Sequence, residues 1–175
     1  MATDADAEFS ALVQRQSRFV FKVAYAVLLN SYDAEDAVQE TFLKLYRTTG
    51  WKDAENERAY LARVAWRVAI DYKRRSATSA SLPSDPLTLD AMASSHPGPH
   101  DAISEANQHA TVHALIDSLP EELRVPLVLS AFEDLNSREI GNILGIPEGT
   151  VRTRLQRARH VLREKLTSAK ETRYA

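Results

Sequence analysis

The tightest constraint on the fold of this chain lies in residues 137–166, where two apolar helical patterns are separated by a glycine and a proline. The first pattern places its apolar residues on one helix face: Ile140, Ile143 and Leu144. Gly145 can end this helix with a left-handed backbone. Pro147 can open the next helix, because a first-turn proline removes no needed N–H donor. The segment therefore predicts a helix-turn-helix.

The second helix of this motif carries different side chains on its two sides. Its buried stripe is predicted as Val151, Leu155, Ala158 and Leu162. The opposite side is polar and basic: Arg152, Thr153, Gln156, Arg157 and His160. Arginine pairs with guanine edges, glutamine with adenine and threonine with either, so this side suits base reading in a DNA major groove. The flanking arginines are better placed for phosphates: Arg154, Arg159 and Arg163. The alternative is a solvated, arginine-rich helix in a bundle.

The rest of the chain also shows helical periodicity, and no strand pattern interrupts it. Helices are expected over residues 9–29, 33–47, 57–75, 101–118 and 121–132. Their inward side chains include Leu12, Val20, Val23, Phe42, Leu45, Leu61 and Val68. We predict an all-α fold of two small helical domains, residues 1–76 and 104–175, of which the second carries the helix-turn-helix. A flexible, acidic, Ser/Pro-rich linker over residues 77–103 joins them.

Charge is segregated along the chain, although the formal net charge is only −2. Residues 58–75 hold six bases and one acid, and residues 138–175 hold nine bases and four acids. Between them, residues 76–118 hold five acids and no lysine or arginine. Two basic blocks on either side of an acidic spacer indicate two separate nucleic-acid contacts.

One side of the predicted helix over residues 57–75 combines bases with an aromatic and an aliphatic residue: Arg63, Trp66, Arg67, Ile70, Lys73 and Arg74. Aromatic rings among cations suit unpaired DNA, because bases stack on the rings while the cations hold the backbone. The alternative for Trp66 is a half-buried ring in a helical bundle.

The helix over residues 33–47 has a mixed acidic and apolar side: Glu35, Asp36, Gln39, Glu40 and Leu43. Acids in a first helical turn favour the helix dipole, which explains Glu35 and Asp36 without a partner. The dipole does not explain the other three. The face is therefore either a docking surface for a basic protein or a solvated face.

Several classes of function are disfavoured. The chain has no cysteine, so disulfides and cysteine metal sites are excluded, and a reducing cytoplasm is expected. No apolar run is long enough for membrane insertion. Histidines form two pairs at four-residue spacing, His96 with His100 and His109 with His113, but the first pair lies in a proline-rich segment. We expect no metal site and no cofactor. No nucleophile–base pair or phosphate-binding glycine loop is present, so we expect no enzyme.

Three motifs in order resemble one family. They are DAEDAVQETFLKLYR at residues 33–47, RAYLARVAWRVAIDYKRR at 58–75, and LPEELRVPLVLSAFEDLNSREIGNILGIPEGTVRTRLQRAR at 119–159. The chain resembles a bacterial RNA polymerase sigma factor of the extracytoplasmic-function (ECF) group of the sigma-70 family. The likeness covers nearly all of residues 9–166 outside the linker. The family often has Ala-Arg-Asn where this chain has Ala65, Trp66 and Arg67.

The resemblance implies a dissociable specificity subunit that directs promoter-specific initiation. The helix over residues 33–47 would dock on core RNA polymerase, and the helix over residues 58–75 would capture the non-template strand of the −10 element in promoter DNA. The helix-turn-helix would read the −35 duplex, and an anti-sigma factor is the expected further partner. Two rivals stay open. One is a stand-alone helix-turn-helix regulator that binds a palindrome, and the other is a sigma mimic that sequesters a regulator.

Overall fold

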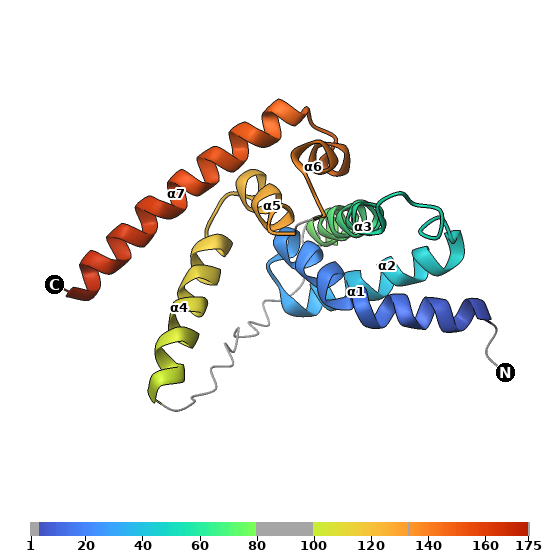
Figure 1. Cartoon of the computed structure of the whole chain (residues 1–175), viewed down its shortest axis with the longest axis horizontal. Coiled ribbons are helices and arrows are strands. Elements are labelled where there is room, and N and C mark those ends of the chain that lie inside the picture. Colours follow the sequence, from blue (N-terminus) through green and yellow to red (C-terminus); the bar gives the residue numbers. More distant parts are fainter. Residues whose placement is uncertain (1–3, 80–99, 133, 175) are drawn as a thin grey trace.

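The computed structural model describes residues 4–79, 100–132 and 134–174, and every regular element in these ranges is an α-helix. In chain order (Figure 1) the helices are α1 (Asp4–Leu28), α2 (Ser31–Thr48), α3 (Glu57–Ser79), α4 (His100–Asp117), α5 (Glu121–Ser130), α6 (Ser137–Leu144) and α7 (Glu148–Tyr174). The predicted all-α class is confirmed. The central part of the predicted linker, residues 80–99, lies outside the described residues.

The first three helices pack on one another around a stripe from each helix. Most of the inward side chains predicted from periodicity are buried here, among them Leu12, Val20, Leu45, Leu61 and Val68, whereas Val38, Val64 and Tyr72 are half-buried. The buried positions of α2 and α3, which pack against each other, include small residues: Ala34, Ala37, Ala62, Ala65 and Ala69. Alanine leaves little side chain between two backbones, so the two helices can approach closely and still exclude water.

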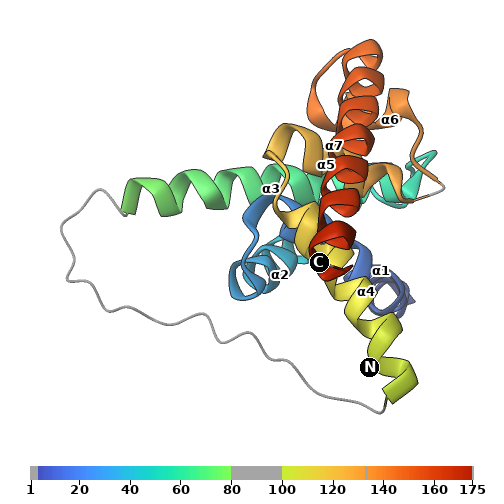
Figure 2. The same ribbon diagram turned by 90° about the vertical axis from the view of Figure 1, so that its left-hand side faces the viewer.

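The two helical parts also pack against each other, which the sequence did not predict. A single hydrophobic cluster runs from α1–α3 into α5, α6 and α7 through Val125, Leu129, Ile140, Ile143 and Val151. α5 lies against α1, and α6 lies beside α3 (Figures 1 and 2). Residues distant in sequence therefore share one core, and a linker between two parts does not by itself keep them apart.

A buried arginine holds this packing together. Arg124 on α5 is 5% exposed. Its Nε donates to the carbonyl of Ala26 in α1 at 2.6 Å, and its Nη1 donates to the carbonyl of Leu119 at 2.5 Å. A buried guanidinium is tolerated only when its donors find acceptors, so the end of α1 and the start of α5 are fixed relative to each other.

The helices run past several expected limits. α3 continues to Ser79 and α4 begins at His100, so the predicted domain limits at residues 76 and 104 fall inside helices. α7 extends to Tyr174, beyond the motif that predicted it. The C-terminal turns of α3 project away from the packed helices (Figure 2), consistent with the exposure of residues 73–79. The domain limits remain predictions.

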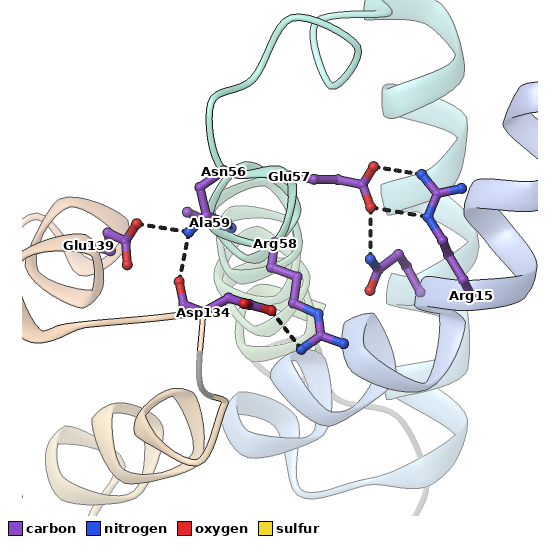
Figure 3. A network of polar contacts seen from close by, with 8 residues as sticks. Arg15, Asn56, Glu57, Arg58, Ala59, Asp134 and Glu139 are labelled. Carbon is purple, nitrogen blue, oxygen red and sulfur yellow. Dashed lines mark hydrogen bonds and ion pairs between the residues drawn. The ribbon is translucent and has the colours of Figure 1, made fainter.

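The start of α3 is tied to α1 by a carboxylate. Glu57 accepts hydrogen bonds from Arg15 Nη2 at 2.6 Å and from Gln16 Nε2 at 2.7 Å (Figure 3). Burial raises the pKa of Glu57, but the hydrogen bonds and the nearby guanidinium outweigh burial and hold this pKa below its ordinary value. The ionised form of Glu57 is therefore the form that stabilises the fold.

The lowered pKa of Glu57 predicts that the stability this side chain contributes depends on pH. Because the pKa of Glu57 is lower in the folded than in the unfolded chain, its stabilisation is present above the unfolded pKa and is lost as pH falls through the folded pKa. Glu57→Gln is expected to lower the Tm at pH 7, and the gap from the parent chain should narrow by about pH 3. Glu171→Gln, in an exposed turn of α7, is the matched control. A gap of equal size at both pH values would contradict this origin of the stability.

Candidate nucleic-acid interface

The helix-turn-helix is closed by local hydrogen bonds at both ends of α6. Asn136 caps the helix by accepting from the N–H of Glu139 at 3.0 Å, and Glu139 Oε2 accepts from the N–H of Asn136 at 2.8 Å. This reciprocal capping box satisfies two donors that the helix start would leave unpaired. At the other end Gly145 has φ +68°, as its position at the turn predicted. The sequence thus fixes the turn locally.

The turn also brings two backbones together at a second glycine. The carbonyl of Gly141 accepts from the N–H of Ile146 at 3.0 Å. A Cβ placed on Gly141 would lie 2.7 Å from the carbonyl oxygen of Ile146. That separation is too short for a carbon and an oxygen, so only glycine fits where the turn folds back over α6.

α7 presents the predicted base-reading side chains to solvent. Of the predicted buried stripe, Val151, Leu155 and Ala158 are buried, whereas Leu162 is half-buried. Five of the six residues predicted to contact −35 DNA are exposed: Arg152, Thr153, Gln156, Arg157 and Arg159. The sixth, Arg154, is half-buried and lines a shallow hollow with Pro147, Thr153 and Arg157 between α5 and α7.

Two of these side chains have partners on α7 itself. Arg152 Nη2 lies 2.5 Å from Glu148 Oε1, one turn earlier, and Thr153 Oγ1 donates to the Gly149 carbonyl at 3.0 Å. An exposed i,i+4 ion pair contributes only about 0.3–0.5 kcal/mol, so DNA could displace Glu148 at small cost.

The predicted −10 residues on α3 fall into two groups. Arg67, Lys73 and Arg74 are exposed, whereas Arg63, Trp66 and Ile70 are half-buried. Trp66 and Ile70 pack against the shared hydrophobic cluster, so the alternative weighed for Trp66, a half-buried ring in a bundle, describes its setting in this structure. Lys73 Nζ forms an ion pair with Glu121 on α5. The sequence could not reveal this division, because it depends on the packing of α6 beside α3 and on the ion pair between Lys73 and Glu121 of α5.

The predicted docking face of α2 is mostly open to solvent. Glu35, Asp36 and Gln39 are exposed, and Leu43 is 56% exposed. Glu40 is half-buried, with Arg75 Nη2 2.9 Å and Lys44 Nζ 3.4 Å from its carboxylate oxygens. The hydrogen bond from Arg75 is the main reason why the pKa of Glu40 lies below its ordinary value.

Two aromatic residues of this face were missed from the sequence. Tyr32 is 81% exposed and Tyr46 is 53% exposed. With Asp36, Gln39 and Leu43 they follow the 4-3-4-3 spacing of one helix stripe, and that spacing could have identified them. Large apolar surface that stays exposed on a polar helix indicates an interaction site.

The described residues were also compared with the requirements of a metal site and of a membrane-spanning helix. Among the described residues, no three histidine, aspartate or glutamate side chains converge in a way that could hold a metal ion. His109 and His113 are exposed on α4. His96 lies outside the described residues, and of His100 only the helical backbone is described. In the part of the chain that the structure covers, no helix has the length and apolar character needed to cross a bilayer.

The fold and these surfaces define a helical DNA-binding protein with a helix-turn-helix, and comparison with known families narrows the class. Residues 12–78 match the family model "Sigma-70 region 2", and residues 109–162 match "Sigma-70, region 4". The two matches cover the three-helix part and the helix-turn-helix part respectively.

Curated relatives agree with these matches. The chain is 34% identical over 157 residues to the ECF RNA polymerase sigma factor SigE of Mycolicibacterium smegmatis, with 89% of this chain and 60% of that protein aligned. It is 30% identical over 170 residues to the ECF RNA polymerase sigma factor SigW of Bacillus subtilis, with 93% and 90% aligned. The chain thus spans three fifths of the mycobacterial relative and nearly all of the Bacillus one.

Solved structures share the fold. The sigma factor RpoE of Bartonella quintana, solved with the anti-sigma factor NepR, matches with a TM-score of 0.66 at 18% identity, covering 91% of this chain and 97% of that one. CnrH, solved with the cytosolic domain of CnrY, matches with a TM-score of 0.58 at 22% identity, covering 91% and 88%.

The chain belongs to the ECF group of the sigma-70 family. It is a transcription initiation factor that directs RNA polymerase to promoters.

Gly141 and Gly149 give a matched test of the turn. Gly141→Ala places a Cβ 2.7 Å from the Ile146 carbonyl, and should destabilise the fold by about 1–3 kcal/mol. Gly149→Ala meets no heavy atom within 4 Å and lies in α7, so it should be neutral or stabilising by up to about 1 kcal/mol. Urea unfolding measures both. Equal effects would mean that the close approach at Gly141 does not constrain the turn.

Proposed function

We propose that three surfaces of this sigma factor divide promoter recognition between them. On α7, Arg152, Thr153, Gln156 and Arg157 read the edges of the −35 base pairs, while Arg154 and Arg159 contact the flanking phosphates. The observation that carries this assignment is a capped helix-turn-helix whose second helix buries its apolar stripe and leaves these polar side chains exposed.

On α3, the six residues Arg63, Trp66, Arg67, Ile70, Lys73 and Arg74 hold the non-template strand of the −10 element. Two features support this assignment. The exposed bases Arg67 and Arg74 lie one above the other at seven-residue spacing. Trp66 and Ile70 lie beside them on the same side of the helix, where bases of an unpaired strand could stack.

On α2, Glu35, Asp36, Gln39, Glu40 and Leu43 form the docking face for core RNA polymerase. The exposed rings of Tyr32 and Tyr46 extend it at both ends. Apolar surface surrounded by carboxylates suits a partner with a basic, partly apolar surface, because charge then guides the encounter and apolar burial holds the complex.

The proposal also covers a regulatory partner of this chain and its place of action in the cell. The structures of RpoE and CnrH each contain a second protein, and the one bound to RpoE, NepR, is described as an anti-sigma factor. We infer that an anti-sigma factor also regulates this chain. The site of action is the cytoplasm, where core polymerase and promoter DNA are found, and the chain performs no catalysis of its own.

Run-off transcription with core polymerase and a library of promoters tests the proposal as a whole. RNA from a defined set of promoters, absent without the chain, is the expected result. A stand-alone regulator would instead bind a palindrome tightly without polymerase and give a symmetric footprint. A sigma mimic would bind its partner and support no RNA synthesis from any promoter in the library.

Base reading by α7 can be separated from polymerase binding. Arg152→Ala and Gln156→Ala should each reduce discrimination at one −35 position by about 1–3 kcal/mol while binding to core polymerase is retained. Lys170→Ala is the matched control, since Lys170 is an exposed cation further along α7. Promoter-library transcription gives the sequence preference. An unchanged preference in both variants would place base reading elsewhere.

The contribution of α2 to binding of core polymerase can be tested with a matched control substitution on α4. Leu43→Ala should weaken binding to core polymerase by about 1–2 kcal/mol, because much of an exposed leucine side chain would no longer be buried in the complex. Val112→Ala on α4 removes a comparably exposed apolar side chain outside the proposed face. Titration of labelled chain with core polymerase measures both affinities. If Val112→Ala weakened binding as much as Leu43→Ala, docking would not be specific to α2.

A further inference from the structure

Two side chains of α3 reach across to carboxylates on the acidic face of α2. Tyr72 Oη donates to Asp33 Oδ1 and to Asp36 Oδ2, in each case at 3.2 Å. Three residues further along α3, Arg75 Nη2 donates to Glu40 Oε2 at 2.9 Å. Asp36 and Glu40 belong to the face assigned to polymerase docking. We call Tyr72 and Arg75 the brace, because they connect α3 to these carboxylates.

The brace lies on the opposite side of α3 from the residues assigned to the −10 strand. An α-helix has about 3.6 residues per turn, so Arg63, Arg67 and Arg74 lie along one side of it. On the same spacing Tyr72 and Arg75 lie along the other side, where they contact α2. The same turns of α3 can therefore hold DNA on one side and support α2 on the other.

The two brace side chains also contact each other. The guanidinium carbon of Arg75 lies 5.7 Å from the centre of the Tyr72 ring, which is a cation–π distance. Burial raises the pKa of Tyr72 above its ordinary value, and the carboxylates of Asp33 and Asp36 raise it further. The hydroxyl therefore keeps its proton at neutral pH and acts as the donor. The brace thus offers a neutral donor and a cation to the acids of α2.

The ion pair of the brace is too exposed to contribute much to folding stability. The side chain of Arg75 is 62% exposed and that of Glu40 is 31% exposed. Exposed pairs contribute little, because water screens the charges and two long side chains lose freedom. The core between the helices is made by other residues, among them Leu45 and Val68. What the brace fixes is the position of the carboxylates on α2.

We propose that Tyr72 and Arg75 are positioning residues for polymerase docking, which hold the carboxylates of Asp36 and Glu40 in the orientation that core polymerase binds. The proposal rests on the assignment of the α2 face to docking. A side chain that is already ordered loses less conformational freedom on binding, so a braced carboxylate binds more tightly than a free one. An ionised carboxylate has about four acceptor positions, so one bond to the brace leaves room for a cation of core polymerase.

A double-variant cycle with core polymerase tests the role of Arg75. The chain has no cysteine, so a fluorophore on Thr167→Cys reports a titration with core polymerase in the absence of DNA. Arg75→Gln should weaken binding by about 2- to 10-fold in the parent chain. In a Glu40→Gln chain the same change should have no further effect. Arg138→Gln removes an exposed guanidinium from α6 and should leave the affinity unchanged.

The hydroxyl of Tyr72 is tested in the same titration. Tyr72→Phe keeps the ring and removes the donor, so it should also weaken binding by about 2- to 10-fold. The loss should be smaller in an Asp36→Asn chain. Tyr60→Phe removes a different hydroxyl from α3 and is the matched control. Thermal unfolding checks that each variant is folded at the temperature of the titration, so that a change in affinity is not a loss of fold.

Three results would overturn the positioning role. An unchanged affinity in a brace variant would mean that the carboxylate it contacts needs no support. Tighter binding by Arg75→Gln would mean that Arg75 competes with polymerase for Glu40. An equal loss of affinity with and without the partner carboxylate would mean that the brace residue acts on polymerase by another route.

Failure of the docking assignment would give a different pattern. If Asp36→Asn, Glu40→Gln and Leu43→Ala all leave binding to core polymerase unchanged, α2 is not the docking face and the brace has nothing to position. If these changes weaken binding while Tyr72→Phe and Arg75→Gln bind like the parent chain, the docking face stands and the positioning role is wrong.

Discussion

The relative position of α3 and α7, the two helices predicted to contact DNA, depends on one buried guanidinium. Arg124 joins the carbonyl at the end of α1 to the carbonyl that precedes α5, and both bonds are short. Because the charge is removed from water, the arrangement is tolerated only with its acceptors in place. The apolar cluster around it can then run unbroken from α1 into α7. α3 and α7, which carry the two basic blocks of the sequence, therefore share one hydrophobic cluster.

The predicted contact faces of α7, α2 and α3 differ in how far this packing leaves them exposed to solvent. The α7 face needs no rearrangement of the fold to meet a duplex, since its side chains are exposed and their partners lie on the same helix. The α2 face is also open, and two of its acids are held by α3, Asp36 by Tyr72 and Glu40 by Arg75. The predicted −10 face of α3 differs, because Trp66 and Ile70 pack against the hydrophobic cluster and Lys73 pairs with Glu121 of α5. Tertiary packing as well as residue type therefore decides which of the predicted contact residues reach solvent.

Much of this could be predicted from the sequence, and the limits have a physical origin. Helical periodicity identified inward residues such as Leu12 and Val68, because one apolar stripe per helix is enough to define a bundle. The turn at Gly145 was predictable because backbone geometry restricts the residues that fit there. The packing of α6 on α3 was not, since Ile140 and Ile143 would be apolar whichever surface they met. Likewise, nothing near Arg124 in sequence reveals that its acceptor lies in α1, and the linker over residues 80–99 falls outside the described residues.

The length of α7 has a practical consequence. The helix has 27 residues and is therefore about 40 Å long. The positions proposed to read bases lie in its first three turns, and the last buried residue of its stripe is Ala158. The remaining turns form a stiff arm of more than ~20 Å. A fluorophore or affinity tag attached near Tyr174 would stand clear of the duplex and, because the arm is rigid, would still report the orientation of the recognition helix.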